Sequence, residues 1–316
     1  MLHFAEIIER DDPDCILMVN SDVCSSFPLR ELVESHLKNG GLGTMLVKTA
    51  AGGDLDATEF GNAICDAQER LLHYTDKPET RVGDLINTGV YAFSRRIFNH
   101  IRRFIESKAA LGSSRAGAPG ETQGADYARI DDVFVALAGK NTCSYDQLFV
   151  HASSGFWEKV KTPGFALKCS SMYLDRYRET EPSMLADCHS SADCRPNISG
   201  NVHIHASAHV HRDAFIGPNV SIAAGVYVGA GARLRDCIVL EDVKISEHAC
   251  VRRAILGWKS KIGKWSRIEG AGRYSERLGV SILGESVIVQ DEGIVVNCIV
   301  LPNKTLSGTS RGDIIL

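Results

Sequence analysis

Aliphatic side chains recur at every sixth position from Ile198 onwards. These positions are Ile198, Ile204, Val210, Ile216, Ile222, Val228, Leu234 and Leu240. A second apolar residue follows four places after each of the first seven, at Val202, Ala208, Ala214, Val220, Val226, Ala232 and Ile238. A period of six fits neither the 3.6 residues of an α-helical turn nor the strict alternation of a half-buried strand. It is typical of a solenoid of hexapeptide repeats, in which three short strands and three turns close one triangular coil.

The repeat continues less regularly in the last part of the chain. The next repeat positions are Ile245, Val251, Gly257, Ile262 and Ile268, and the pattern predicts a shift of register near 258–264. Residues 270–280 are charged and small, so we expect an excursion there. The period resumes at Ile282, Ile288, Ile294 and Val300, with Leu283, Val289, Val295 and Leu301 beside them. The sequence therefore predicts a solenoid over residues 198–316.

The first part of the chain carries strand and helix patterns instead. Apolar runs predict strands at 15–19, 44–48, 60–64, 71–74, 85–93 and 148–150, and helical spacing predicts helices at 29–38, 94–110, 130–137 and 165–177. The run at 15–19 is apolar throughout and predicts a buried strand. Strands that alternate with helices indicate a mixed α/β layer. We therefore predict an α/β domain over 1–181, a linker at 182–197 and the solenoid over 198–316.

Charge and composition narrow the class of protein. A net charge of −4 gives no reason to expect nucleic acid or an anionic membrane as a partner. No apolar run has the length of a membrane-spanning helix, and the first residues lack the segments of a signal peptide. Ten cysteines without a Cys-x-x-Cys pair are typical of reduced thiols in a cytoplasmic protein. A metal site at Cys188, His189, Asp193 and Cys194 is the alternative.

One carboxylate follows a predicted strand at the place where open α/β sheets bind their ligands. Asp22 lies three residues after the strand at 15–19. In this position it can hold a divalent cation through its oxygen atoms. It can equally cap the turn that follows the strand. The residues of this stretch leave both interpretations open.

Six stretches spread along the chain form a specific combination of motifs. They are 19–29 (VNSDVCSSFPL), 72–78 (LHYTDKP), 86–91 (INTGVY), 132–139 (DVFVALAG), 217–222 (GPNVSI) and 314–316 (IIL). Together they resemble the sugar-1-phosphate nucleotidyltransferase family, and within it the alpha, or regulatory, type of GDP-mannose pyrophosphorylase subunit. The resemblance implies an incomplete Rossmann-like α/β domain followed by a left-handed β-helix. It also implies the family's reaction, in which GTP and mannose-1-phosphate give GDP-mannose and diphosphate.

The resemblance assigns roles to individual residues. The expected sugar-nucleotide-binding residues are Gly61, Asp76, Lys77, Asn87 and Thr88, and the expected metal-binding residue is Asp22. Asp76 and Lys77 match the segment that contacts sugar and phosphate in active members. Gly61 matches a backbone contact to the sugar, and Asn87 matches the amide that reads a sugar hydroxyl. Asp22 matches one of two aspartates that hold Mg²⁺.

The chain departs from the active members at two places. No G-x-G-x-R loop, whose backbone N–H groups would hold the nucleotide phosphates, stands near Met1. We therefore expect a nucleotidyltransferase domain that is truncated at its N-terminus. Lys159 stands where the second metal-binding aspartate is expected, and an ammonium group repels Mg²⁺. The neighbouring Glu158 would point to the opposite face of a strand. We assign no catalytic residue and expect weak or absent Mg²⁺ binding.

This combination favours a regulatory subunit that does not transfer guanylyl groups alone. The expected partner is a catalytic beta-type GDP-mannose pyrophosphorylase subunit, in a homo- or hetero-oligomer, and the expected ligand is GDP-mannose or GTP. The excursion at 270–280 is shorter than the inhibitory insertion that the alpha type usually carries at this place.

Two other classes of function stay open. A hexapeptide-repeat acyltransferase would use a histidine as general base, and its candidates are His203, His205, His209 and His211. A non-enzymatic oligomerisation scaffold would need only the solenoid, with Trp258 and Trp265 as interface anchors.

Overall fold

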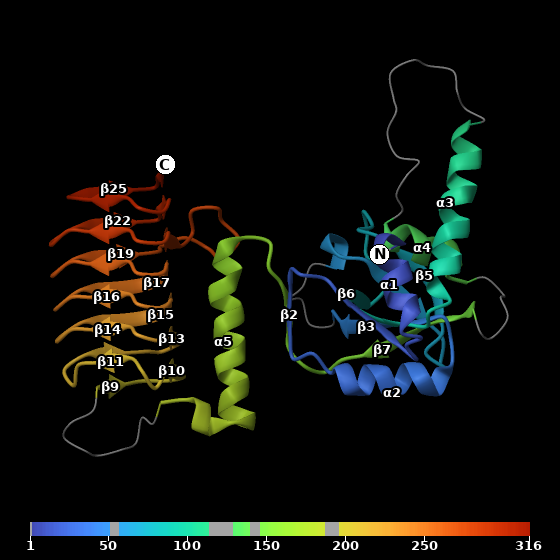
Figure 1. Cartoon of the computed structure of the whole chain (residues 1–316), viewed down its shortest axis with the longest axis horizontal. Coiled ribbons are helices and arrows are strands. Elements are labelled where there is room, and N and C mark those ends of the chain that lie inside the picture. Colours follow the sequence, from blue (N-terminus) through green and yellow to red (C-terminus); the bar gives the residue numbers. More distant parts are fainter. Residues whose placement is uncertain (1, 51–56, 114–128, 140–145, 187–195) are drawn as a thin grey trace. The chain divides into compact units, whose positions relative to one another are not determined.

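The chain forms two compact units, Met1–Trp157 and Glu158–Leu316 (Figure 1). The structure is a computed structural model. It describes residues 2–50, 57–113, 129–139, 146–186 and 196–316. In the helix that ends at Ser113, side chains are described only up to residue 108. The predicted metal cluster at Cys188, His189, Asp193 and Cys194 lies outside these residues.

The first unit is built on a sheet whose central strand is β6 (Leu85–Phe93). The other strands of this sheet are β1 (Ile16–Val19), β3 (Gly43–Thr49), β4 (Asn62–Cys65), β5 (Leu71–Thr75) and β7 (Leu148–Ala152). The order is β5-β4-β6-β3-β7, and β1 pairs with β6 beside β4. Only β3 and β7 run parallel; the other named pairs are antiparallel. The sheet is therefore mixed, as the alternating pattern of strands and helices predicted.

Helices cover both faces of this sheet. They are α1 (Ala5–Arg10), α2 (Leu29–Asn39), α3 (Ile97–Ser113) and α4 (Ile130–Leu137), with short 3-10 turns η1 (Leu2–Phe4) and η2 (Ala57–Glu59). Side chains alternate along β6, so that Val90 and Ala92 pack with Leu32 of α2, whereas Tyr91 and Phe93 pack with α3 and α4. The unit is a three-layer α/β/α arrangement with apolar core residues on both faces of the sheet.

The prediction of a buried strand at 15–19 is wrong in one respect. In β1 the residues alternate between half-buried and exposed, with Leu17 42% and Val19 43% exposed. Their cross-strand partners are Ala92 and Val90, which places both side chains on the α2 face of the sheet. Helix α2 packs mainly against β3, β6 and β7 and covers β1 much less. The apolar run therefore gave the strand correctly and its burial incorrectly.

The second unit contains a β-solenoid of about seven turns, consistent with the predicted left-handed β-helix. Its strands form three parallel ladders, one on each face of the coil. The first ladder is β9 (Asn197–Ile198), β12 (Phe215–Ile216), the start of β15 (Arg233–Val239), the start of β17 (Cys250–Leu256), β19 (Arg267–Glu269), β22 (Ile294–Val296) and β25 (Thr309–Arg311). The second is β10 (Val202–Ile204), β13 (Val220–Ile222), the ends of β15 and β17, β20 (Ser281–Leu283), β23 (Ile299–Val300) and β26 (Ile314–Ile315). The third is β11 (His209–Val210), β14 (Tyr227–Val228), β16 (Lys244–Ile245), β18 (Lys261–Ile262), β21 (Ile288–Val289) and β24 (Thr305–Leu306).

Most predicted repeat positions are right, among them Ile245, Val251, Ile262, Ile268 and Val300 in the later turns, and the others are shifted by one residue. Paired residues lie 18 apart at Val202↔Val220 but 17 apart at Val220↔Cys237, because one hexad is shortened to five residues. As a result Val239 is buried, whereas the predicted Ile238 and Leu240 are only half-buried.

A second shortened hexad moves the inward position from Gly257 back to Leu256, whereas after the excursion at 270–280 the predicted period resumes one residue too early. The apolar side chains in the core are those of Leu256, Leu283, Val289 and Val295, where Gly257, Ile282, Ile288 and Ile294 were predicted. The first of these shifts lies between Val251 and Leu256, before the predicted slip at 258–264.

One turn of the solenoid is ten residues longer than its neighbours. Ala254 pairs with Ser281, a separation of 27 residues where 17 is usual in this part. The extra residues lie between β19 and β20, in the segment 270–280. Arg253 holds this excursion, since its guanidinium lies 4.7 Å from the Tyr274 ring and Nη2 donates to the Gly272 carbonyl at 2.7 Å.

Helix α5 (Pro163–Thr180) belongs to the second unit and lies along the stack of coils (Figure 1). At its start, the Thr162 hydroxyl donates to the Tyr274 carbonyl at 2.6 Å. At its end, the Arg178 side chain donates to Asn201 and Gly200 in the first coil. The boundary between the two compact units therefore lies before α5. The domain limits 1–181, 182–197 and 198–316 stay a prediction from the sequence.

Candidate functional site

Three of the five predicted sugar-nucleotide-binding residues, Gly61, Asp76 and Asn87, lie around one buried side chain, Tyr74. Gly61 directly precedes β4, Asp76 and Lys77 directly follow β5, and Asn87 is on β6. These three strands are neighbours in the sheet, which brings segments distant in sequence together. A Cβ atom on Gly61 would lie 2.1 Å from the Tyr74 hydroxyl oxygen, so only glycine leaves room for this ring.

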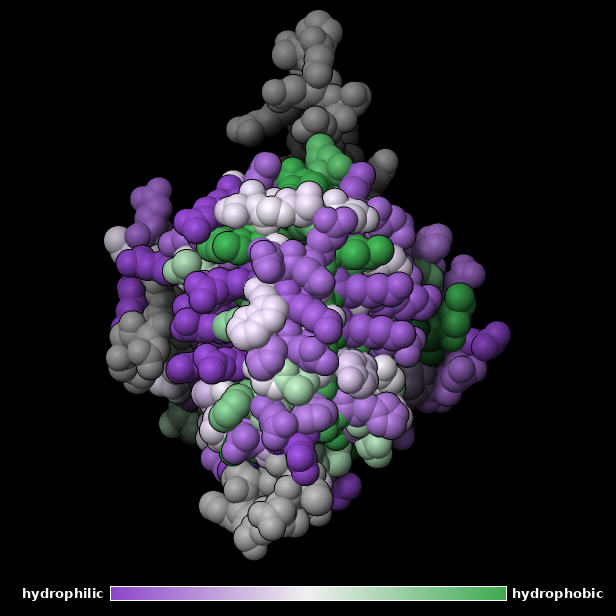
Figure 2. All heavy atoms as spheres, turned by 90° about the vertical axis from the view of Figure 1, so that its left-hand side faces the viewer, coloured by the Kyte–Doolittle hydropathy of each residue, from purple (hydrophilic) through white to green (hydrophobic). Residues whose placement is uncertain are grey.

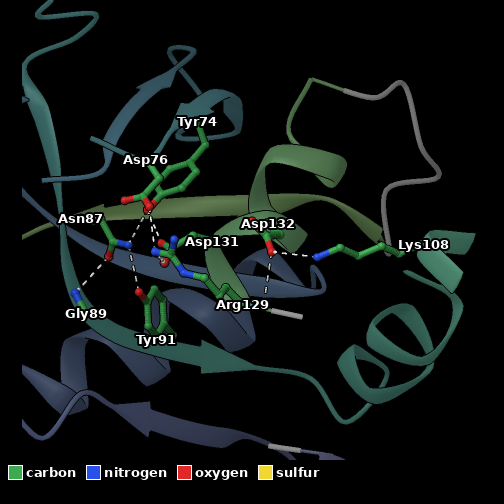
Figure 3. Close-up of polar contacts among 9 residues, drawn as sticks. All are labelled: Tyr74, Asp76, Asn87, Gly89, Tyr91, Lys108, Arg129, Asp131 and Asp132. Atoms are coloured by element: carbon green, nitrogen blue, oxygen red, sulfur yellow. Dashed lines mark hydrogen bonds and ion pairs between the residues drawn. The ribbon is translucent and has the colours of Figure 1, made fainter. Parts of the chain in front are cut away.

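The Asn87 amide is fully engaged with its surroundings (Figure 3). Its Nδ2 donates to the hydroxyl groups of Tyr74 and Tyr91, both at 2.9 Å. Its Oδ1 accepts a hydrogen bond from the backbone N–H of Gly89 at 2.9 Å. The amide orientation is therefore fixed by three partners, and Asn87 ties the floor of the site to the sheet.

A pair of carboxylates shares one guanidinium above this floor. The Arg129 Nη2 donates to Asp76 at 2.7 Å and to Asp131 at 3.2 Å, and Figure 3 shows these side chains converging on Tyr74. The Tyr74 hydroxyl in turn donates to Asp131 at 2.5 Å. Side-chain exposure is 24% for Asp76, 21% for Asp131 and 55% for Arg129. The network thus runs from the buried sheet to the solvent, where Asp76 and Arg129 are accessible.

Burial and neighbouring charge keep the two phenols protonated. Burial, followed by the charge of Asp131 and its hydrogen bond, raises the pKa of Tyr74 far above its ordinary value. Burial also raises the pKa of Tyr91. The hydrogen bond to Asp76 raises the pKa of Arg129, which keeps the guanidinium charged. The Tyr74 hydroxyl is consequently a permanent donor to Asp131 and an acceptor from Asn87.

The remaining predicted residues are placed differently. Lys77 is exposed and has a backbone φ of 45°, a left-handed conformation at the turn after β5. Thr88 is buried, and its hydroxyl donates to the Leu46 carbonyl at 2.7 Å within the sheet. The Thr88 carbonyl accepts from the indole of Trp157 at 2.8 Å. Thr88 therefore makes its hydrogen bonds inside the fold.

Four residues of the network were not among the predicted site residues: Tyr74, Tyr91, Arg129 and Asp131. Tyr74 and Tyr91 lie within the stretches 72–78 and 86–91, where a polar atom on a buried aromatic residue could have pointed to them. Arg129 and Asp131 come from the start of α4, more than fifty residues from Asp76 in sequence. No local pattern predicts that contact.

The predicted metal-binding residue does not lie in a recognisable metal centre. Asp22 follows β1, just before β2 (Val23–Ser25). Over the described parts of the chain, no group of three or more His, Cys, Asp or Glu side chains is placed to hold a metal ion. In the second unit Glu158 is buried, at the limit between the units in β8 (Trp157–Lys159), and accepts from Lys168 at 2.5 Å. Its carboxylate is thus paired within the fold, as a structural ion pair.

The histidines of the acyltransferase alternative lie in the first turn of the solenoid. His205, His209 and His211 are exposed, and His203 is half-buried with its pKa lowered by burial and by His205. His205 is bonded to Ser207 of its own turn, and His211 accepts from the Asp213 backbone. This arrangement is that of strand and corner residues, and no observation on these side chains favours an acyl-transfer site.

Among the helices that the structure describes, none combines the length and apolar character needed to cross a bilayer.

Two family models match the chain and define its class. A model described as nucleotidyl transferase matches residues 1–114, and one described as GMPPB C-terminal domain matches residues 198–315. The first unit is therefore of the nucleotidyltransferase type, and the solenoid is the C-terminal domain that accompanies it.

Similar proteins identify the family. The chain is 37% identical to the mannose-1-phosphate guanylyltransferase regulatory subunit alpha of Dictyostelium discoideum, over 100% of this chain and 76% of the relative. It is 37% identical to the Homo sapiens protein of the same description, over 100% and 78%, and 35% identical to subunit alpha-A of Danio rerio, over 99% and 77%. The chain belongs to the family of mannose-1-phosphate guanylyltransferase regulatory subunits alpha.

Proposed function

We propose that this chain is a regulatory subunit that binds a sugar nucleotide in its first unit and does not itself catalyse guanylyl transfer. The observation that carries the proposal is the network in which Asp76 and Asn87 are held by Tyr74, Asp131 and Arg129. Its buried end is fixed and its outer end is accessible, which suits recognition of a polar ligand. Gly61 and Lys77 flank this network and complete the proposed site.

The absence of a second metal carboxylate supports a non-catalytic role. A Mg²⁺ ion held by two carboxylates would supply the positive charge that offsets negative charge on the phosphates during nucleotidyl transfer. The metal ligand that the resemblance assigns is Asp22, Lys159 stands at the place of the expected second ligand, and the carboxylate of Glu158 is paired with Lys168. These residues do not fit a two-carboxylate Mg²⁺ site, and we propose weak or absent Mg²⁺ binding.

The proposed partner is a catalytic beta-type GDP-mannose pyrophosphorylase subunit, and the proposed ligand is GDP-mannose or GTP. The relatives are named regulatory subunits, which supports assembly with a separate catalytic chain. On this proposal the chain binds the sugar nucleotide and alters the activity of the catalytic subunit in a hetero-oligomer. A cytoplasmic location stays an expectation from the sequence.

Ligand-induced stabilisation tests the proposed binding site. GDP-mannose that binds the folded chain raises the midpoint of thermal unfolding, by a free energy that grows as RT ln(1 + [L]/Kd). We expect a concentration-dependent rise for the full chain and a smaller one for Asp76→Asn. The matched control is Asp84→Asn, because Asp84 is also bonded to an arginine at 2.7 Å but lies outside the network. A flat response of the unaltered chain would contradict the proposal and favour a scaffold.

A further inference from the structure

Arg129 is positioned by two carboxylates, yet most of its donors are not used by them. Both contacts are made by Nη2, at 2.7 Å to Asp76 and 3.2 Å to Asp131. A guanidinium carries five N–H donors in a planar fork. Within the described residues, Nε and Nη1 have no hydrogen-bond partner in the structure, and the side chain is 55% exposed. The guanidinium is therefore held in place from one side and presents donors on another.

Asp76 likewise uses only one of its two carboxylate oxygens in this network. Only its Oδ2 bonds to Arg129, and the side chain is 24% exposed. Over the part of the chain that the structure describes, Oδ1 accepts no hydrogen bond in this network. The pair thus offers a carboxylate oxygen and guanidinium N–H groups side by side at the outer end of the network (Figure 3).

The charges around this pair balance. Asp76, Asp131 and Asp132 are negative, whereas Arg129, the adjacent Lys77 and Lys108 beside Asp132 are positive. A balanced site does not attract a strongly charged group, but its acceptor and donors suit neighbouring hydroxyl groups. Each sugar hydroxyl can donate to a carboxylate oxygen and accept from a guanidinium N–H.

The support beneath the pair is rigid. Asp131 is bonded to Tyr74, Tyr74 is bonded to Asn87, and Asn87 is bonded to Tyr91 and Gly89 on the central strand β6. Side chains that are ordered before the ligand arrives lose little entropy on binding. The outer pair is therefore prepared for recognition.

We propose that Arg129, together with Asp76, contacts two neighbouring hydroxyl groups of the sugar in a bound sugar nucleotide and thereby sets the preference for that sugar. This inference rests on the proposed function, since it assigns the sugar end of the proposed site. It adds Arg129, at the start of α4, as a ligand contact beside the residues expected from the sequence.

Calorimetric titration of the full chain with GDP-mannose and with GDP tests the assignment. Arg129→Gln keeps hydrogen-bonding capacity but removes the charge and the fork. We expect it to weaken GDP-mannose binding by about tenfold or more, the usual effect of losing a charge-assisted hydrogen bond. GDP, which lacks the sugar, should bind Arg129→Gln as well as it binds the unaltered chain. Arg129→Lys should bind GDP-mannose with an affinity between those of Arg129→Gln and the unaltered chain.

Arg81→Gln is the matched control. Arg81 is 48% exposed and donates to Asp84 at 2.7 Å, so its ion pair resembles that of Arg129 but lies outside the network. This variant should bind both ligands unchanged. The melting temperature of each variant reports whether the fold is retained.

The other outcomes distinguish a wrong assignment of Arg129 from a wrong proposed function. Arg129→Gln that weakens both ligands equally, weakens neither, or tightens GDP-mannose binding would overturn the assignment of Arg129 and leave the proposed function intact. Equal affinity of the unaltered chain for GDP-mannose and GDP would overturn it as well, because the sugar would then not be contacted. An unaltered chain that binds neither ligand would overturn the proposed function and the assignment together.

Discussion

Tyr74 connects the polar residues of the network to the apolar core of the first unit. Its ring packs against Phe134 in the core at a centroid distance of 5.5 Å, and its hydroxyl joins Asp131 to Asn87. Buried polar atoms cost free energy when they lose their partners, more than the bond itself contributes. The tyrosine therefore couples the apolar core to the outer part of the site.

Tyr74→Phe tests this coupling. The variant keeps the ring but leaves Asp131 Oδ1 without the Tyr74 donor and Asn87 Nδ2 without one of its two acceptors. We expect a loss of about 1–3 kcal/mol in local stability, measured by hydrogen exchange of peptides from β6. Tyr227→Phe, which removes a hydroxyl from a tyrosine 49% exposed on the solenoid, should change stability by less than about 0.5 kcal/mol. Equal effects of the two variants would show that the network contributes nothing.

His36 gives the first unit a dependence on pH. It is buried in α2 with Nδ1 3.1 Å from the Thr44 hydroxyl oxygen, and burial, followed by the charge of Arg96, lowers its pKa below the ordinary value of 6.5. The folded state therefore binds the proton less tightly than the unfolded state. This contribution to stability is complete above pH 6.5 and is lost as the pH falls below it.

The stability of His36→Gln as a function of pH is the corresponding measurement. We expect the unaltered chain to lose free energy of unfolding between pH 7 and about 5.5, and we expect His36→Gln to lose less. The exposed His209→Gln serves as a control for the number of histidines. A slope that is the same in all three chains would contradict the assignment to His36.

At the scale of elements, the solenoid shows what hydrophobic periodicity can and cannot determine. The period identifies the type of fold, because few other structures place apolar residues six apart. It does not identify which of two adjacent aliphatic residues points inward. Ile238 continues the predicted period although the shortened hexad has moved the inward position to Val239, and after the excursion Ile282 and Leu283 are both aliphatic although only Leu283 is in the core. Strand pairing resolves the difference, because it fixes the shortened hexad and the lengthened turn.

Adjacent substitutions in β20 test the register. Leu283→Ala creates a cavity in the solenoid core and should lower the free energy of unfolding by about 2–5 kcal/mol. Ile282→Ala removes a similar volume from a half-buried position and should cost clearly less. Urea unfolding of the full chain, followed by circular dichroism, measures both. The reverse order of the two effects would support the register predicted from the sequence.

At the scale of the whole molecule, the motifs indicated residues of the candidate site but not the contacts that join them. Asp76 and Asn87 were expected to contact a sugar nucleotide from the resemblance alone, and both lie in one network. The contact between Arg129 and Asp76 joins the start of α4 to the end of β5, and it exists only because the sheet brings these segments together. The division before α5 is likewise a result of packing, since this helix lies along the solenoid.

The rate of GDP-mannose formation is the measurement that most directly tests whether this chain is a regulatory subunit. GTP, mannose-1-phosphate and Mg²⁺ are supplied to the chain alone, to a catalytic GDP-mannose pyrophosphorylase subunit alone, and to both together. We predict background turnover for the chain alone. We also predict that adding the chain changes the rate of the catalytic subunit, or its inhibition by GDP-mannose, and that Asp76→Asn weakens this response. Turnover by the chain alone well above background, or a catalytic rate that saturating amounts of the chain leave unchanged, would contradict the account.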